Sequence, residues 1–160
     1  MEYVITEFFN KKIILVSKGN AIISICFDNQ PNFKKYIKTA KLNNSSVILN
    51  ETKTQLSEYI KGKRTDFSIN VQPNGTKFEN QVWCELVKIE YGKISTYLSI
   101  AKSIDKPNGY RAVANAVGKN PISIIIPCHR VIRSNGQLGG YSGGVNIKEK
   151  LLKLENISHN

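Results

Sequence analysis

The sequence predicts an α+β chain in which an antiparallel sheet with helices comes first and a mainly helical part follows. Three observations support this. β-rich runs crowd the start of the chain, helical spacing of apolar residues dominates its second half, and Gln72-Pro73-Asn74-Gly75 interrupts the pattern between them. Pro and Gly break regular structure. We therefore expect one unit over residues 1–73 and a second over residues 74–160.

The first unit opens with three β-rich runs separated by turn-forming residues, a pattern typical of antiparallel hairpins. These runs are Glu2–Phe9, Lys12–Ser17 and Ala21–Phe27. Apolar residues at helical spacing then predict helices over Phe33–Ala40 and Leu56–Ile60. Two short segments, Val47–Leu49 and Phe67–Val71, have the character of further strands.

The second unit begins with a helix, because Thr76 and Glu79 have the spacing of a capping box. Ser95 or Thr96 can cap a second short helix, and a helix of small residues, Tyr110–Val117, follows a turn. Two short helices joined by a glycine-containing turn fit a helix-turn-helix. Any helical hairpin in a small core has the same spacing, so both interpretations stay open.

The small-residue helix is slim, and Arg111 stands at its start. An ordinary α-helix is about 10–12 Å across with its side chains, whereas the DNA minor groove is about 6 Å wide. A helix without bulk can enter a widened minor groove and project one long cation. The alternative is a core helix, in which small residues permit close packing.

The composition points to a polyanionic partner. The chain has 160 residues and an apolar fraction of 41%, too high for a disordered chain. Its 23 Lys and Arg against 12 Asp and Glu give a net charge of +11. This argues against an ordinary acidic metabolic enzyme and favours nucleic acid or an anionic membrane surface. The longest near-continuous apolar stretch, Ile122–Ile126, is far shorter than the roughly 20 residues of a membrane span, which weakens the membrane alternative.

Three widely spaced cysteines, Cys26, Cys84 and Cys128, form neither a disulfide framework nor a zinc pair. We expect a reducing, cytoplasmic setting, no secretory signal and no metal or other cofactor. Cys26 and Cys84 fit the usual interpretation of a lone cysteine as a small buried apolar residue.

Cys128 stands in a different setting, because Pro127 stops a stiff apolar segment before it and His129 follows it. A histidine can lower the pKa of a thiol and produce the nucleophilic thiolate. Adjacent side chains in an extended segment point to opposite faces, so contact needs a turn at Pro127 or a bridging water. Local chemistry alone does not decide whether the Cys128 thiol is reactive or structural.

Two further features lie downstream. Five glycines between Gly136 and Gly144 flank Tyr141, which suits a loop whose amides approach a planar ligand while the ring supplies a wall. A flexible surface loop is the alternative. Glu155 ends the last helix, where it can orient His129, although a solvated terminal carboxylate is the simpler interpretation.

Taken in order, these motifs resemble those of the O6-alkylguanine-DNA alkyltransferase family. The matching segments are Gly75-Thr76-Lys77-Phe78, Gln81-Val82-Trp83, Tyr91-Gly92-Lys93-Ile94-Ser95-Thr96-Tyr97, Arg111-Ala112-Val113, Asn120-Pro121, Pro127-Cys128-His129-Arg130-Val131 and Gly139-Gly140-Tyr141-Ser142-Gly143-Gly144. They span Gly75 to Glu155, about half of the chain. The resemblance implies a ribonuclease H-like first unit and a winged helix-turn-helix in the second.

The resemblance also implies direct-reversal DNA repair. The alkyl group of O6-alkylguanine, or of O4-alkylthymine, in duplex DNA would pass irreversibly to Cys128, once per molecule, in a protein acting as a monomer. His129 would take the thiol proton through a water, and Glu155 would polarise His129. Tyr97 would serve the guanine ring nitrogen, and Asn120 would tie the helix-turn-helix to the active-site segment.

The same resemblance assigns residues to the extruded base and to the DNA. Val131 would accept from the exocyclic amine through its carbonyl, Tyr141 would pack on the base, and the Ser142 amide would donate to O6. Arg111 would fill the vacated stack as a finger. Beside the DNA would lie Tyr97, Tyr110 and Ala112.

Two other classes share part of these features. A non-catalytic lesion-binding module would use the same helix-turn-helix and charge, but such relatives lack the acceptor cysteine that Cys128 provides. A Cys–His–Glu hydrolase would use the triad alone and turn over repeatedly without DNA. The basic chain and its slim helix argue against the hydrolase.

Overall fold

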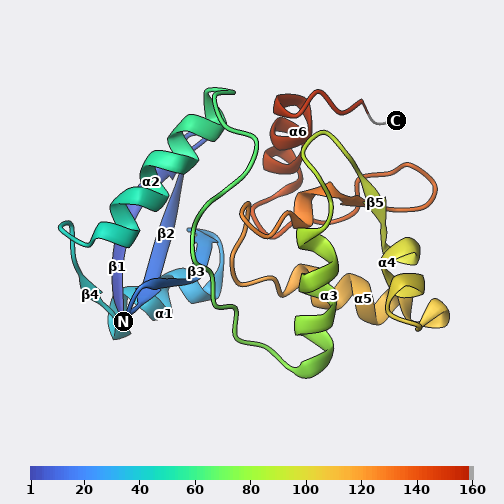
Figure 1. The fold of residues 1–160 in the computed structure, drawn as a ribbon, viewed down its shortest axis with the longest axis horizontal. Coiled ribbons are helices and arrows are strands. Elements are labelled where there is room, and N and C mark those ends of the chain that lie inside the picture. The colour runs from blue at the N-terminus through green and yellow to red at the C-terminus, as the bar shows by residue number, and fades with distance from the viewer. Residues whose placement is uncertain (159–160) are drawn as a thin grey trace. The chain divides into compact units, whose positions relative to one another are not determined.

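The structure is a computed structural model that describes residues 1–158, and it divides into two compact units at Pro73 and Asn74 (Figure 1). The first unit is built on a four-stranded sheet in the order β3-β2-β1-β4, antiparallel except that β4 runs parallel to β1. Its strands are β1 (Glu2–Phe8), β2 (Lys11–Lys18), β3 (Ala21–Phe27) and β4 (Lys41–Leu42). The three predicted strands are confirmed, and the two-residue β4 was not predicted.

The central strand β2 is buried along most of its length, from Ile13 to Ser17. Ile14 and Val16 pack with Phe33 of α1 (Pro31–Thr39) on one face of the sheet. Alternate residues of a strand point to opposite faces, and α2 (Val47–Ile60) contacts β1, β2 and β3 (Figure 1). The sheet and its helices therefore form the core of this unit.

Two predicted strands of the first unit are wrong. Val47–Leu49 begins α2, in which buried residues recur at helical spacing through Leu56 to Tyr59 and override the local β-propensity. Phe67–Val71 forms no strand and has no regular secondary structure apart from one isolated bridge. Only Val71 bridges to Ile22, through backbone bonds of 2.8 Å on either side.

The second unit is mainly helical, as predicted. Its elements are α3 (Lys77–Val87), β5 (Ser95–Thr96), α4 (Tyr97–Ser103), the 3-10 turn η1 (Pro107–Gly109), α5 (Tyr110–Gly118), the 3-10 turn η2 (Cys128–Arg130), β6 (Val131–Ile132) and α6 (Val145–Leu154). β5 and β6 pair in parallel. The helices α4 and α5, joined through η1, form the helix-turn-helix.

Local signals fix the ends of these helices. At α3 the capping box is complete, with Glu79 N donating to Thr76 Oγ1 at 3.2 Å and Thr76 N donating to Glu79 Oε2 at 2.8 Å. Thr96 caps α4 by accepting from Ser99 N at 3.1 Å. Trp83 Nε1 donates to Ala116 O at 2.9 Å and so ties α3 to α5.

No helix among residues 1–158 combines the length and apolar character that crossing a membrane requires.

Candidate active site

The segment before Cys128 is folded by two tight turns. Ile125 N donates to Ser123 O at 3.0 Å across Ile124, whose φ of 78° lies in the left-handed region that a β-branched residue rarely adopts. Cys128 N then donates to Ile126 O at 2.8 Å across Pro127, which has the angles of an inverse γ-turn. Of the two alternatives for bringing Cys128 to His129, the turn at Pro127 is present, and Cys128 opens the 3-10 turn η2 rather than a strand.

Asn120 braces this segment from the end of α5. Its amide Nδ2 donates to Ile126 O at 2.8 Å and to Cys128 Sγ at 3.1 Å, and its Oδ1 accepts from Ile122 N at 3.0 Å. The side chain is buried, so each bond replaces contact with water that the amide has lost. Asn120 therefore links the helix-turn-helix to the sulfur atom.

Burial sets the protonation of the Cys128–His129 pair. Cys128 is 4% exposed, and desolvation raises the pKa of its thiol against the Asn120 hydrogen bond and the charge of Lys148. Desolvation also lowers the pKa of His129, which is fully buried, against the opposing effect of Glu155. Desolvation therefore outweighs every opposing effect on the thiol pKa in the resting protein, and both groups are neutral at pH 7.

Glu155 is buried rather than solvated, because three residues bind its carboxylate. Arg130 donates from Nε to Oε2 and from Nη2 to Oε1, both at 2.9 Å, and His129 Nε2 lies 2.8 Å from Oε1. Gly92 N donates to Oε2 at 3.1 Å. The interpretation of Glu155 as a solvated terminal carboxylate is wrong, while its contact with His129 is present.

Two buried cations of this site escaped the sequence analysis. Arg130 forms the ion pair with Glu155 and also donates from Nη1 to Ile89 O at 2.6 Å. Lys148 donates from Nζ to Val131 O at 2.6 Å and to Leu138 O at 2.5 Å. A signal for Lys148 existed, since it lies one residue after Ile147 on the buried side of α6 and one heptad before Glu155.

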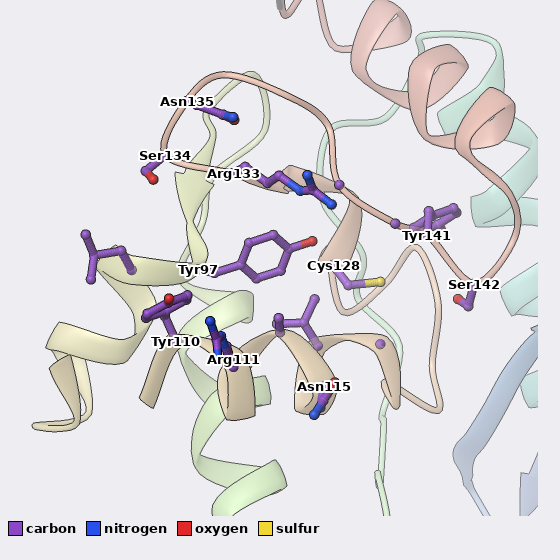
Figure 2. Close-up of a pocket in the computed structure, with 16 residues that line it drawn as sticks. Tyr97, Tyr110, Arg111, Asn115, Cys128, Arg133, Ser134, Asn135, Tyr141 and Ser142 are labelled. Atoms are coloured by element: carbon purple, nitrogen blue, oxygen red, sulfur yellow. The ribbon is translucent and has the colours of Figure 1, made fainter. Parts of the chain in front are cut away.

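Cys128 opens into a cavity of about 670 Å³ between the helix-turn-helix and the segment Arg133–Gly144, which we call the wing loop (Figure 2). Tyr97 of α4, Tyr110 and Arg111 of α5, and Tyr141 and Ser142 of the wing loop also line it. In Figure 2 the Tyr97 ring and the Cys128 side chain lie between Arg133 above and the α5 side chains of Arg111 and Asn115 below.

The remaining predicted residues lie outside the lining of this cavity. His129, Glu155, Asn120 and Val131 are buried, and Val131 sits in β6. Ala112 is exposed on α5. Cys84 is exposed as well, so its interpretation as a buried thiol is wrong, whereas Cys26 is buried as expected.

The wing loop approaches Tyr97 closely. A Cβ atom on Gly139, whose φ is 73°, would lie 2.9 Å from the Tyr97 hydroxyl oxygen, so only glycine fits there. Desolvation raises the pKa of Tyr97, as does the nearby Cys128, while the Arg133 charge opposes the shift. The hydroxyl is therefore protonated at neutral pH and can donate a hydrogen bond into the cavity.

Comparisons with known proteins cover both units. The family model for the ribonuclease-like domain of 6-O-methylguanine DNA methyltransferase matches residues 1–73, and that for its DNA-binding domain matches residues 77–157. A methylated-DNA–protein-cysteine methyltransferase of Methanosarcina barkeri is 53% identical over 105 residues, which make up 66% of each chain. One from Haemophilus influenzae is 38% identical over 152 residues, 92% of this chain and 82% of the relative.

A solved structure extends this similarity to the fold. The crystal structure of Mycobacterium tuberculosis OGT in complex with DNA matches with a TM-score of 0.89 at 34% identity, covering 97% of this chain and 92% of that one. The match confirms the predicted fold class of a ribonuclease-like unit followed by a winged helix-turn-helix. Because both units match in order, this chain belongs to the 6-O-methylguanine DNA methyltransferase family.

Proposed function

We propose that this protein repairs alkylated DNA by direct reversal, moving the alkyl group from O6 of guanine, or from O4 of thymine, to the sulfur of Cys128. The observation that carries the proposal is the cavity that joins Cys128 to the exposed start of α5, where Arg111 stands. The relatives named as methylated-DNA–protein-cysteine methyltransferases support the same chemistry. The partner is double-stranded DNA, and the protein acts in the cytoplasm as a monomer.

The chemistry begins with the neutral pair of Cys128 and His129. His129 takes the thiol proton through a water, and the sulfur attacks the alkyl carbon, forming the S–C bond as the C–O6 bond breaks. The electron pair of the broken bond stays on guanine, which takes a proton at its ring nitrogen from the Tyr97 hydroxyl. The proton on His129 then restores Tyr97 through solvent, so the charges balance. Glu155 holds His129 in place and stabilises the imidazolium that forms.

The reaction requires the base to leave the helix, because its O6 substituent is inaccessible to Cys128 inside stacked DNA. Arg111 enters the vacated stack from the start of α5 and offsets part of the few kcal/mol that extrusion costs. Exposed Ala112 lets the helix approach the groove, and Tyr110 adds an aromatic contact beside Arg111, whose guanidinium carbon lies 5.9 Å from its ring centroid. The net charge of +11 supplies sequence-independent affinity.

The wing loop, η2 and the start of β6 behind the cavity lining would hold the base. Tyr141 packs on its face, the Ser142 amide donates to O6, and the carbonyls of Cys128 and Val131 accept from the exocyclic amine. Asn120 keeps the sulfur aligned through its bond to Sγ. A thioether is a poor leaving group, so each molecule reacts once.

The direct test is to incubate the folded, reduced protein with a duplex that contains one O6-methylguanine and to weigh the protein. We expect one methyl adduct, located on Cys128 by peptide mapping. Cys84→Ser is the matched control, because it removes the exposed thiol and should keep the adduct, whereas Cys128→Ser should lose it and still bind DNA. A protein without a methyl group on Cys128 would refute the proposal.

The finger role of Arg111 has its own test. Arg111→Ala should slow repair of the duplex much more than reaction with free O6-benzylguanine, which needs no extrusion. Single-turnover rates on the two substrates measure this ratio. Equal losses on both would show that Arg111 acts on the chemistry or the fold and not on the DNA.

A further inference from the structure

A second arginine in the cavity, Arg133, has no part in the chemistry described above. It is exposed, begins the wing loop directly after β6, and lines the same cavity as Cys128. Figure 2 shows its guanidinium turned back into the cavity on the wing side, above the Tyr97 ring. The opposing effect of its charge on the pKa of Tyr97 agrees with this closeness.

The turn that follows holds Arg133 in this orientation. Its backbone N donates to Gln137 O at 2.9 Å, Gly136 N donates to Arg133 O at 3.0 Å, and Gln137 N donates to Asn135 Oδ1 at 3.1 Å. The guanidinium Nη1 donates to Gln137 Oε1 at 3.3 Å. The side chain is therefore tethered at its far end by a neutral group, which orients the charge without cancelling it.

The two arginines that follow Cys128 in the chain, Arg130 and Arg133, have different partners. Arg130 is buried and neutralised by Glu155. Arg133 forms no ion pair with any carboxylate in residues 1–158, and the described lining of the cavity contains no Asp or Glu. The cavity therefore presents an uncompensated cation at its rim, on the side opposite Arg111. Such a site favours an anion.

We propose that Arg133 binds the phosphate of the extruded nucleotide, an inference that rests on the proposed function. A base that reaches Cys128 carries its phosphodiester along to the rim of the cavity. The planar guanidinium fork matches phosphate oxygens and stays charged at every working pH. Arg111 cannot serve this phosphate while it occupies the stack, so the two arginines divide the work: one fills the gap and the other holds the displaced backbone.

The test compares Arg133→Gln with Lys153→Gln, which removes the same charge from exposed α6 outside the cavity. Single-turnover rates are measured on an O6-methylguanine duplex and on free O6-benzylguanine, which has no phosphate. Arg133→Gln should lower the duplex rate roughly tenfold more than the free-base rate, the factor that corresponds to one charge-assisted hydrogen bond. Lys153→Gln should leave the ratio of the two rates unchanged.

Salt dependence supplies a second readout in a Cys128→Ser background, which binds without reacting. For the alkylated duplex, Arg133→Gln should reduce the slope of log affinity against log salt by about 0.9, the value for one phosphate contact. The slope for unmodified duplex should not change, because that base stays stacked.

Three outcomes overturn the inference. Equal rate losses on both substrates would mean that Arg133 acts on Tyr97 and not on a phosphate. If Arg133→Gln repairs the duplex at the wild-type rate, Arg133 has no role in the reaction. If it changes the salt slope for both the alkylated and the unmodified duplex, Arg133 is a general DNA contact. If wild-type protein forms no Cys128 adduct with either substrate, the proposed function itself fails, which separates the two results.

Discussion

Replacing Glu155 with glutamine is the sharpest test of the charge cluster behind the cavity. The carboxylate accepts hydrogen bonds from Arg130 and Gly92 and lies 2.8 Å from His129 Nε2. Glutamine has nearly the same shape but carries no charge and turns one acceptor oxygen into a donor. The substitution therefore leaves Arg130, which is 7% exposed, as a buried cation without a counter-ion.

The magnitude follows from that burial. Removing one partner of a buried ion pair costs about 3–5 kcal/mol, a large share of the roughly 5–15 kcal/mol that keeps a domain folded. With a urea dependence of about 1–3 kcal/mol per M, the unfolding midpoint should fall by about 1 M or more. The rate of transfer should also fall, by about tenfold or more, because His129 loses the group that orients it and opposes the desolvation of its charged form.

Urea titration at pH 7, followed by circular dichroism, measures the stability, and single-turnover reaction with O6-benzylguanine measures the rate. Glu85→Gln is the control, since it breaks an ion pair with the mostly exposed Lys88, and such pairs contribute only about 0–1 kcal/mol. If the two variants unfold at the same urea concentration, the buried pair does not carry the stability assigned to it. If Glu155→Gln keeps the wild-type rate, His129 does not need its carboxylate.

Two further predictions concern Gly139 in the wing loop and Lys148 in α6. Gly139→Ala should slow alkyl transfer from both duplex and free-base substrates, because the new Cβ would lie 2.9 Å from the Tyr97 hydroxyl oxygen. Gly140→Ala is the control and should keep the wild-type rate, because a Cβ there meets nothing within 4 Å. Equal rates for the two variants would contradict the contact assigned to Gly139. Burial lowers the pKa of Lys148 to about 8 from its ordinary 10.5, so between these values the unfolded chain holds a proton that the folded chain releases, and stability rises with pH. Relative to Lys148→Met, the wild-type free energy of unfolding should gain about 3 kcal/mol from pH 8 to 10.5, and parallel urea titration curves for the two proteins would refute this.

The parts of the fold that local chemistry determines were predictable. The capping box at Thr76 and the hairpin strands follow from neighbouring residues, and each appears in the structure. Val47–Leu49 was misjudged because its β-propensity is local, whereas the buried face of α2 is decided by packing against the sheet. The two-residue β4 has too little sequence to show a period.

The same distinction holds in the candidate site. Cys128 and the aromatic residues of the cavity were identified from motifs, whereas Arg133 was not assigned to it. The cluster behind the cavity depends on pairs far apart in the chain. Arg130 meets Glu155 across 25 residues, and Lys148 reaches Val131 O across 17. No sequence spacing reveals whether a terminal carboxylate turns inward, so local chemistry alone favoured a solvated Glu155, and only the resemblance to the alkyltransferase family placed it beside His129. The structure places the buried Arg130 beside this carboxylate, and their ion pair keeps Glu155 buried.

The burial of Cys128 fits an acceptor that is used only once. A permanent thiolate would be consumed by any small electrophile, whereas a thiol with a raised pKa and 4% exposure is a weak nucleophile until its proton is removed. His129 is neutral and can take that proton, and its carboxylate partner is already in place. The cavity is the approach to the sulfur, so the electrophile that reacts is one delivered through it. In the proposed reaction, burial therefore limits the reactivity of the resting thiol, and His129 with Glu155 would remove its proton once a substrate fills the cavity.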